Sequence, residues 1–436
     1  MRPTKLFIDF SSIPLKVGKF TLFDLLLISI SAFLAVAIIG FILATILRRF
    51  VRARKFKTLD RLRSIYREKL KDVIYSGNFQ PEVIKPFLSV PNSLKFQAIE
   101  EVLFVLLENK KYEEEIKEMF NKLGYINYYK KQAKNKNKII KATAIDKLGK
   151  MKVATSVEII ASQLKNQDPE IITVSLRALA NIGTLESLVA ILNNLPLIYE
   201  KWLVTRKAIE NSILKYGHKA IPILIDFLKG LKNPKIIAII LDILSHLQDE
   251  STWPVALSFL SHDEAEVRAK ALKLIERMTD KIEDKVVTKI FPLLRDPVWF
   301  VRLHAVRALS KVRNNKIHYA LASSLFDHHW RVRKEAAIAL ANLDRGSLDI
   351  FLQALKYDDR YVKETICEEI ERTNLVNRLI ENLGQKNGEL YNKSKEILII
   401  MHSLNFSTPL KEYLKSGPND KIKEEIRQIL ESKGVE

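Results

Sequence analysis

One phrase of sequence repeats along this chain at nearly constant spacing, and the repeat limits what the chain can fold into. Its clearest copy spans residues 296–309, where an Asp-Pro turn precedes apolar residues that recur at helical spacing. Further copies stand at 262–275 and 327–340. Each unit has room for two helices and a short turn. Because neither helix can bury its apolar stripe alone, the units must stack into one continuous core.

An apolar residue opens the second helix of each unit and serves as an anchor for counting. Eight positions later the residue is Leu or Ile in every unit except one, where Ser212 stands beside Ile213. Four positions later it is Ala or Ser in seven of ten units, which lets neighbouring helices approach closely. The pattern predicts an all-α fold, an α–α superhelix of about ten to eleven helix pairs over residues 79–434. The anchors, 28 to 34 residues apart, are Ile140, Ile171, Val204, Ile236, Val267, Val301, Val332, Val362, Leu390 and Ile422.

Aspartates in the turns, and a Val-Arg or Val-Lys pair after most of them, carry a likeness to a known family. The aspartates are Asp168, Asp263, Asp296, Asp327 and Asp358, and the pairs stand at 267–268, 301–302, 332–333 and 362–363. On these residues the chain resembles the HEAT family of α-solenoids, including the short variant found in bilin-lyase-like proteins. The resemblance implies that the aspartates meet helix N-termini or basic residues of the adjacent unit. It does not imply one function, because such arrays perform many unrelated tasks.

Residues 22–47 are predicted to form a transmembrane helix. The stretch 25–47 contains no charged residue, and a bilayer core needs about 20 helical residues. A cleaved signal peptide is the rival interpretation, but its dense positive charge would precede the apolar region, whereas here it follows. We therefore expect a single span after a short extracytoplasmic N-terminus at 1–21.

Basic residues follow the span over 48–78, in a segment that we expect to continue as a helix. Basic loops stay in the cytoplasm, so the N-terminus is expected outside the inner membrane and the solenoid in the cytoplasm. The basic residues nearest the span either bind anionic lipid headgroups or act as a topology signal only. These headgroup candidates are Arg48, Arg49, Arg52, Arg54, Lys55 and Lys57.

The net charge of +20 at first suggests a nucleic-acid binder, but its distribution argues otherwise. Residues 48–75 carry a net charge of +8 and residues 122–152 a net charge of +9, so the remaining array is close to neutral. A groove that tracks phosphates needs its basic residues spread along one face. The Lys-rich stretch 130–138 is either a solvated turn or a second contact to anionic lipid or an acidic partner.

The sequence contains no constellation that predicts catalysis, a metal site or a cofactor. Of the eight histidines, His328, His329 and His304 come nearest to a cluster, but adjacent residues point apart. The one cysteine, Cys367, excludes an internal disulfide and is expected to be a small buried apolar residue. We therefore expect a protein that is not an enzyme.

Large aromatic residues recur at equivalent places in consecutive units. Trp299 and Trp330 stand two residues before their anchors, and Phe300 and Tyr361 stand one residue before theirs. Equivalent positions line up along one edge of a solenoid, so these rings either bind a partner or seal the seam between units. The flanking candidates for partner binding are His328, His329, Arg331 and Arg360.

These features favour a membrane-anchored cytosolic scaffold that binds a protein partner, for instance within an envelope-related membrane assembly. Two alternatives stay open. The first is a nucleic-acid module like the HEAT-type DNA glycosylases, against which the nearly neutral array and the anchor count. The second is a bilin-lyase-like chromophore or protein modification factor, for which no site residue can be carried over.

Overall fold

The computed structural model describes residues 16–17, 20–200, 204–278, 284–312, 315–342, 347–385 and 388–432. The chain forms two compact units, residues 1–131 and residues 132–436. Ahead of the first helix, the two-residue strands β1 (Lys16–Val17) and β2 (Phe20–Thr21) pair antiparallel.

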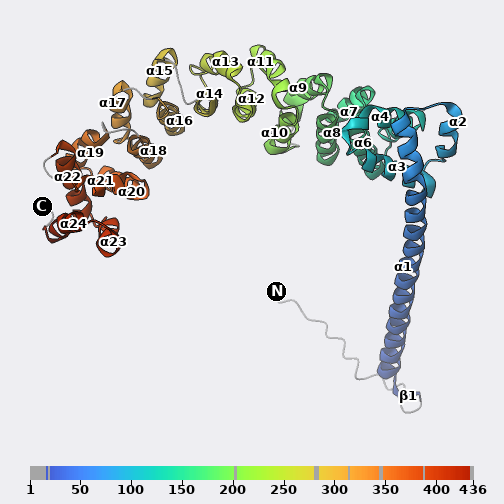
Figure 1. Ribbon diagram of the computed structural model, residues 1–436. Coiled ribbons are helices and arrows are strands. Elements are labelled where there is room, and N and C mark those ends of the chain that lie inside the picture. Colours follow the sequence, from blue (N-terminus) through green and yellow to red (C-terminus); the bar gives the residue numbers. More distant parts are fainter. Residues whose placement is uncertain are drawn as a thin grey trace, which may run out of the picture. The chain divides into compact units, whose positions relative to one another are not determined.

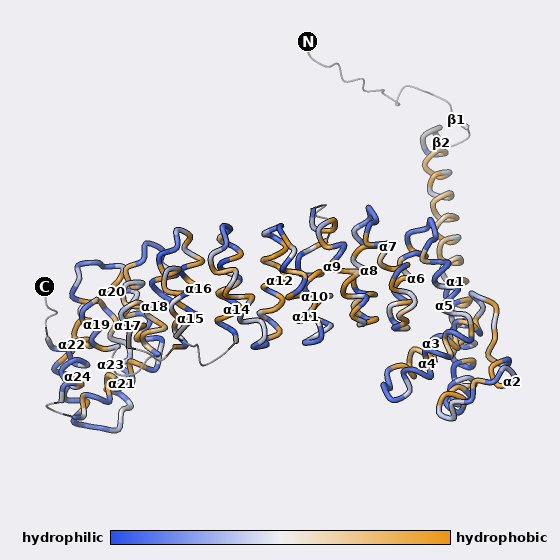
Figure 2. The backbone as a smooth tube through the Cα atoms, turned by 90° about the horizontal axis from the view of Figure 1, so that it is seen from above, coloured by the Kyte–Doolittle hydropathy of each residue, from blue (hydrophilic) through white to orange (hydrophobic). Residues whose placement is uncertain are grey.

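Unit 1 is built on one helix, α1 (Leu22–Ser76), whose 55 residues extend about 80 Å. The apolar side chains of its first half are exposed, and this half is orange in Figure 2. The second half buries Leu59, Leu70 and Ile74 and packs on α3. The remaining helices of unit 1 are α2 (Pro81–Ile84), α3 (Leu94–Leu106), α4 (Glu113–Lys122) and α5 (Tyr125–Gln132).

Unit 2 is a row of helix pairs in two layers (Figure 1). Each even-numbered helix from α6 to α18 packs on the next even-numbered helix. These helices, with α20, are α6 (Lys138–Lys150), α8 (Pro169–Ile182), α10 (Arg206–Leu214), α12 (Pro234–Leu247), α14 (Ala265–Met278), α16 (Trp299–Leu309), α18 (Trp330–Ala341) and α20 (Arg360–Arg372). The odd-numbered helices form the second layer: α7 (Val157–Ser162), α9 (Leu185–Glu200), α11 (Ile221–Lys229), α13 (Trp253–Ser258), α15 (Asp284–Ile290), α17 (Asn315–Ser324) and α19 (Ser347–Lys356).

Short 3-10 helices extend or join several of these elements. They are η2 (Lys85–Phe87), η3 (Lys110–Tyr112), η4 (Ala154–Ser156), η5 (Gln163–Lys165), η6 (Gly217–Ala220), η7 (Glu250–Thr252) and η8 (Phe291–Arg295).

The layer order changes near the C-terminus. The last helices are α21 (Leu375–Asn382), α22 (Glu389–Ser403), α23 (Thr408–Ser416) and α24 (Asp420–Glu431). Here α22 packs on the odd-numbered α19, and α21 packs on the even-numbered α20. The regular stacking therefore runs from α6 to α20, and a differently packed pair follows.

The repeat pattern read from the sequence matches the packing of most units. The anchors Ile171, Ile236 and Val301 are buried, and the small residues Ala144 and Ala336 at the fourth position are fully buried. Small side chains at these places let successive helices of the even-numbered layer approach closely. The anchor of the first unit departs from this pattern, because the side chain of Ile140 is 42% exposed.

The expected anchor Val204 is wrong by one helical turn. Val204 precedes α10, which Thr205 caps, so Ala208 takes the anchor's place. Ser212 then becomes the small buried residue at the fourth position, and its Oγ donates to the carbonyl of Ala208 at 2.8 Å. The apparent exception at Ser212 is thus a shift in register, which follows from the length of the 16-residue helix α9.

Candidate partner-binding surface

An arginine–aspartate ladder fixes the turns that precede α16 and α18. The Nε and Nη2 of Arg268 donate to the two carboxylate oxygens of Asp296, at 2.7 and 3.0 Å. One unit later, Arg302 donates in the same way to Asp327, at 2.6 and 2.7 Å. Each fork is bidentate and mostly buried, which is the strong form of this contact. Three of the five turn aspartates expected to meet basic residues of the adjacent unit do so: Asp296, Asp327 and also Asp168, which pairs with Lys138 at 2.8 Å.

Each aspartate of the ladder also accepts from a backbone N–H at the start of the next helix. Asp296 accepts from Val298 and Asp327 accepts from His329, both at 2.9 Å. Burial alone would raise the pKa of Asp327, but the hydrogen bonds from Arg302 and from His329 outweigh it and lower the pKa. The carboxylate is therefore held in its charged form.

We call each Arg–Asp pair of the ladder a rung. The third rung, at Arg333, has a different form. Arg333 uses its Nη1 to hold the carbonyl oxygens of Asp327 and His328, at 3.0 and 3.3 Å. Its Nε is buried and has no hydrogen-bond partner within the described part of the chain. The expected turn aspartate, Asp358, exposes its whole side chain and lies 4.0 Å from Lys363.

Five of the predicted binding residues come together at the starts of α16 and α18. The rings of Trp299 and His329 stack in parallel with their centroids 3.9 Å apart. The Cζ of Arg331 lies 5.4 Å from the Trp299 ring and 5.2 Å from the Trp330 ring, within the range of cation–π contacts. Phe300 packs edge-on against Trp299. Trp299 thus contacts the next unit, whereas the side chain of Trp330 is 54% exposed.

The remaining predicted residues lie apart from this stack. Tyr361 is 70% exposed, and its ring lies 5.9 Å from the Cζ of Arg333. Arg360 is exposed and pairs with Glu364 on its own helix. His328 is exposed and offers its backbone carbonyl to Arg333.

Two exposed aromatic residues that the sequence reasoning did not single out lie in the same turns. Phe326 and Tyr357 pack edge-on with their centroids 5.2 Å apart. Each directly precedes a turn aspartate, Asp327 or Asp358, and this shared position was a signal that could have identified them. We name the exposed set the aromatic edge: Phe326, Trp330, Tyr357 and Tyr361.

Charged side chains link successive helices of the even-numbered layer in acid–base pairs. The largest group surrounds the buried Asp242 of α12, which pairs with Arg206, Lys270 and Lys273 at 2.7–3.0 Å. Burial would raise the pKa of Asp242, but the two lysines lower it well below its ordinary value. Other pairs across this layer are Asp146–Arg177, Glu276–His304, Arg307–Glu335, Lys334–Glu369 and Lys395–Glu425. These basic residues therefore have acidic partners within the chain.

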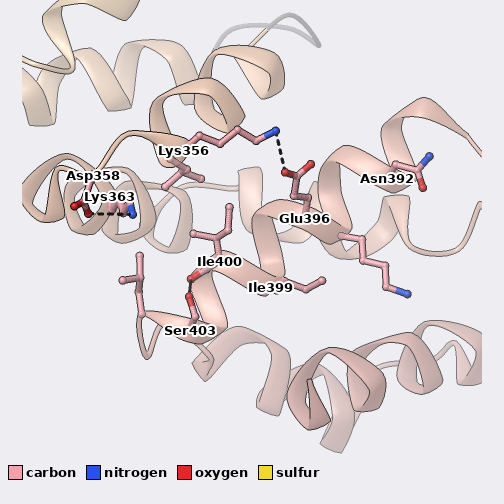
Figure 3. Close-up of a pocket in the computed structure, with 11 residues that line it drawn as sticks. Lys356, Asp358, Lys363, Asn392, Glu396, Ile399, Ile400 and Ser403 are labelled. Carbon is pink, nitrogen blue, oxygen red and sulfur yellow. Dashed lines mark hydrogen bonds and ion pairs between the residues drawn. The ribbon is translucent and has the colours of Figure 1, made fainter. Parts of the chain in front are cut away.

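A groove of about 870 Å³ opens where the layer order changes, between the α19–α20 turn and α22 (Figure 3). Ile399 and Ile400 form part of its floor, and Lys356 reaches across to Glu396 at 3.1 Å. Lys395 on the same wall pairs with the buried Glu425. The groove combines an apolar floor with internally paired charges and holds no nucleophile beside a base among its lining residues.

The described residues bring no three metal-ligating side chains together. His304 hydrogen-bonds Glu276 at 3.1 Å, and His329 caps α18, so the expected near-cluster is spread over separate contacts. Cys367 is fully buried, and burial raises the pKa of its thiol to about 12. A thiol with so high a pKa is a poor nucleophile.

The six lipid-headgroup candidates lie on the exposed stretch of α1 between Leu47 and the buried Leu59. Every side chain of residues 48–58 is exposed. Arg54 lies over the ring of Phe50, with its Cζ 4.4 Å from the centroid. This stretch rises about 16 Å and is basic on all its faces.

Comparison with known proteins assigns the middle of unit 2. A family model described as HEAT repeats matches residues 253–341 and, in a second overlapping register, 287–371. Residues 253–371 are HEAT repeats. The matched range contains both bidentate Arg–Asp pairs, the stacked Trp299 and all four residues of the aromatic edge. HEAT solenoids are commonly protein-interaction scaffolds.

Two solved structures are similar to this chain at low sequence identity. An engineered protein is 16% identical, with 80% of this chain and 98% of that chain covered and a TM-score of 0.34. Kap121p is 14% identical, with 84% of this chain and 50% of that chain covered and a TM-score of 0.34. This chain thus spans about half the length of Kap121p. No curated protein matches the chain in sequence.

Proposed function

We propose that this protein is a membrane-anchored scaffold whose HEAT repeats bind a protein partner in the cytoplasm. The observation that carries the proposal is the division of α1 into an exposed apolar half and a half that packs into unit 1. In the structure of a water-exposed protein, so many apolar side chains would normally be covered. A bilayer covers them without any further protein contact.

The length and flanks of α1 support a single span. The helix is long and apolar enough to cross a membrane, although a signal sequence near an N-terminus meets the same test. Residues 25–47 rise about 34 Å, and a bilayer core is about 30 Å thick. The basic stretch that follows is continuous with the helical core of unit 1, whereas a cleaved leader would be separated from it. Under the positive-inside rule, the part of unit 1 after the span and the HEAT repeats lie on the cytoplasmic side of the inner membrane.

Arg48, Arg49, Arg52 and the three basic residues after them are proposed to meet anionic headgroups. Each exposed cation near such a surface contributes about 1 kcal/mol. Exchange of the six for Gln should weaken salt-sensitive retention of anionic lipid on the purified protein and leave the fold intact. If the variant and the parent chain retain equal amounts of phosphatidylglycerol, these residues act as a topology signal only.

The partner-binding part of the proposal rests on the exposure of the aromatic edge. Trp330 and Tyr361 remain accessible although the stack around Trp299 is packed, and exposed aromatic residues beside arginine are the common composition of binding hot spots. The alternative of a nucleic-acid module is disfavoured because the basic residues that link the even-numbered layer are paired with carboxylates. We propose no enzymatic role, and an envelope-related assembly is one setting that fits a cytoplasmic scaffold.

Cysteine labelling tests the anchor and its orientation. The native Cys367 is buried and gives a silent background. A maleimide that cannot cross membranes should label a Lys5→Cys variant in intact spheroplasts and a Lys415→Cys variant only after lysis. The reverse pattern would overturn the orientation, and recovery of the full chain in the soluble fraction would overturn the anchor.

Site-specific photocrosslinking tests the partner-binding surface. A photoreactive amino acid at Tyr361, on the aromatic edge, is compared with the same residue at Tyr319 on α17. The two side chains are 70% and 74% exposed, so they differ in place and not in accessibility. A discrete crosslinked species from Tyr361 alone supports the proposal. Equal crosslinking from both positions, or none from either, counts against this surface.

A further inference from the structure

The third arginine of the ladder is positioned like the first two but lacks their carboxylate. Arg268 and Arg302 hold backbone carbonyls with Nη1 and present Nε and Nη2 to an aspartate. Arg333 makes the same carbonyl contacts, and its buried Nε is without an acceptor among the residues described. A buried donor without an acceptor is unfavourable, and a charged donor more so. The Nε of Arg333 therefore lacks the carboxylate acceptor that Arg268 and Arg302 have.

A one-residue shift in the turn explains why the chain leaves this rung open. Asp327 stands two residues before the N-cap of its helix, His329. The N-cap of α20 is Asp359, so the corresponding place belongs to Tyr357. Asp358 comes one residue later, and its side chain is fully exposed. A tyrosine at that place cannot supply a carboxylate to Arg333.

We propose that Arg333 binds a carboxylate of the partner polypeptide, an Asp or Glu side chain with apolar neighbours in an extended segment. This inference rests on the proposed function, because it assumes that the aromatic edge contacts a partner. The fork of Arg333 matches a carboxylate as the forks of the two earlier rungs do. Exposed rings of Trp330, Tyr357 and Tyr361 lie in the turns and helix starts beside it and offer contacts for apolar neighbours. Arg331 adds a second cation at the same edge.

The first test supplies a carboxylate to Arg333 from the chain itself. Tyr357→Asp places a carboxylate where the earlier rungs have one, and Tyr357→Asn removes the same ring without adding charge. In the full chain in detergent, the Asp variant should unfold at a higher temperature than the Asn variant, by on the order of 2 °C. Equal midpoints would show that the edge of Arg333 is not available to a carboxylate. A loss of stability in Asp358→Asn would show that Asp358 itself closes the rung. Either result overturns the proposal.

The second test supplies the carboxylate from outside. The probes are fluorescein-labelled peptides with a central Asp between two Leu or two Pro residues, each paired with a twin that has Asn at the centre. Fluorescence polarisation should show that the full-length protein binds an Asp peptide at least about tenfold more tightly than its twin. Arg333→Gln and Tyr357→Asp should each abolish this difference. The Asp variant keeps the arginine in place, so a failure of the Gln variant to fold does not remove the test.

The outcomes separate this inference from the broader proposal. A stabilised Tyr357→Asp variant, together with no preference of the parent chain for Asp peptides, would mean that the rung is simply unfilled, and the inference would be wrong. A preference that persists in both variants would place the carboxylate elsewhere and would overturn the inference as well. Neither result touches the membrane anchor or the crosslinking at Tyr361, which test the scaffold itself.

Discussion

Arg302 holds Asp327 of the following unit through two parallel hydrogen bonds of 2.6 and 2.7 Å, and both side chains are mostly buried. The same aspartate orders the start of α18 by accepting from the N–H of His329. One carboxylate thus joins two neighbouring units and fixes the turn between two helices. The ladder fixes the register between units, because each Arg–Asp pair links a helix to the turn that precedes the corresponding helix of the next unit.

Removal of that carboxylate should cost stability. Asp327→Ala leaves the fork of Arg302 buried and unpaired, and such a loss costs about 3 kcal/mol. We expect a lower midpoint in urea and in thermal unfolding followed by circular dichroism. Asp358→Ala is the matched control, because that side chain is fully exposed and its nearest cation is 4.0 Å away. Equal losses in the two variants would contradict a structural role for the bidentate rung.

The charge cluster at Asp242 should behave as a unit that spans three helices. Asp242→Asn removes the charge that Arg206, Lys270 and Lys273 share and leaves three cations close together. We expect this variant to lose more stability than Asp226→Asn, whose carboxylate is exposed and pairs with Lys229 on the same helix. The loss in the Asp242 variant should shrink as salt is added, since salt screens like charges. A loss that salt does not change would argue that packing, not charge, is at stake.

The two carboxylates also predict how stability depends on pH. The pKa values of Asp242 and Asp327 are lowered in the folded chain, so the folded state releases these protons more readily than the unfolded state. Their contribution is complete above the ordinary carboxyl pKa of about 3.9 and is lost as pH falls below it. Thermal midpoints should therefore drop steeply as pH falls below about 4. The slope should be shallower in the Asp242→Asn variant; an unchanged slope would assign the acid sensitivity to other groups.

A close approach of two helices makes Gly149 intolerant of a side chain. A Cβ added there would lie 2.5 Å from the Cα of Ala178 on α8. Gly149→Ala should force α6 and α8 apart and destabilise the protein by about 1–3 kcal/mol. Gly230→Ala is the control, because a Cβ there meets nothing within 4 Å and its φ of −98° suits any residue. Hydrogen exchange should localise the loss to α6 and α8 and leave α12 protected.

The two tryptophans of consecutive units should respond differently to truncation. Trp299 stacks on His329 and is half-buried, so Trp299→Ala should lower the unfolding midpoint in the manner of a core substitution of about 1–3 kcal/mol. Trp330 is 54% exposed, and Trp330→Ala should change stability little while it weakens partner crosslinking at Tyr361. If both variants unfold equally early, the aromatic residues serve the seam between units and not a partner.

Much of the fold followed from local signals in the sequence. Apolar residues at helical spacing and small residues such as Ala305 and Ala336 predicted the stacked layer, because close packing demands them at fixed places. The slip at Val204 arose because nothing in the apolar spacing recorded an added turn in α9. The exchange of layers at α22 could not be predicted from the sequence, since it depends on how whole helices pack and not on the apolar pattern within each helix.

The location of the candidate site was predictable, but which of its residues are packed and which are accessible was not. Trp299 and Trp330 occupy equivalent places in the sequence, and only the structure separates a packed ring from an accessible one. Likewise, Asp327 and Asp358 look alike as turn aspartates. The one-residue change in distance to the helix cap that sets them apart can be seen only when the cap is known.

The helix α1 runs without interruption from Leu22 to Ser76, and no loop separates its apolar half from the half that packs on α3. The two halves consequently rotate together about the helix axis. An extra residue inserted at 57 would rotate the part of unit 1 that follows it by about 100° about the helix axis relative to the apolar half, whereas four extra residues would nearly restore its orientation. The number of residues between Leu47 and Leu59 therefore sets the orientation of the packed helices of unit 1 relative to the apolar half of α1.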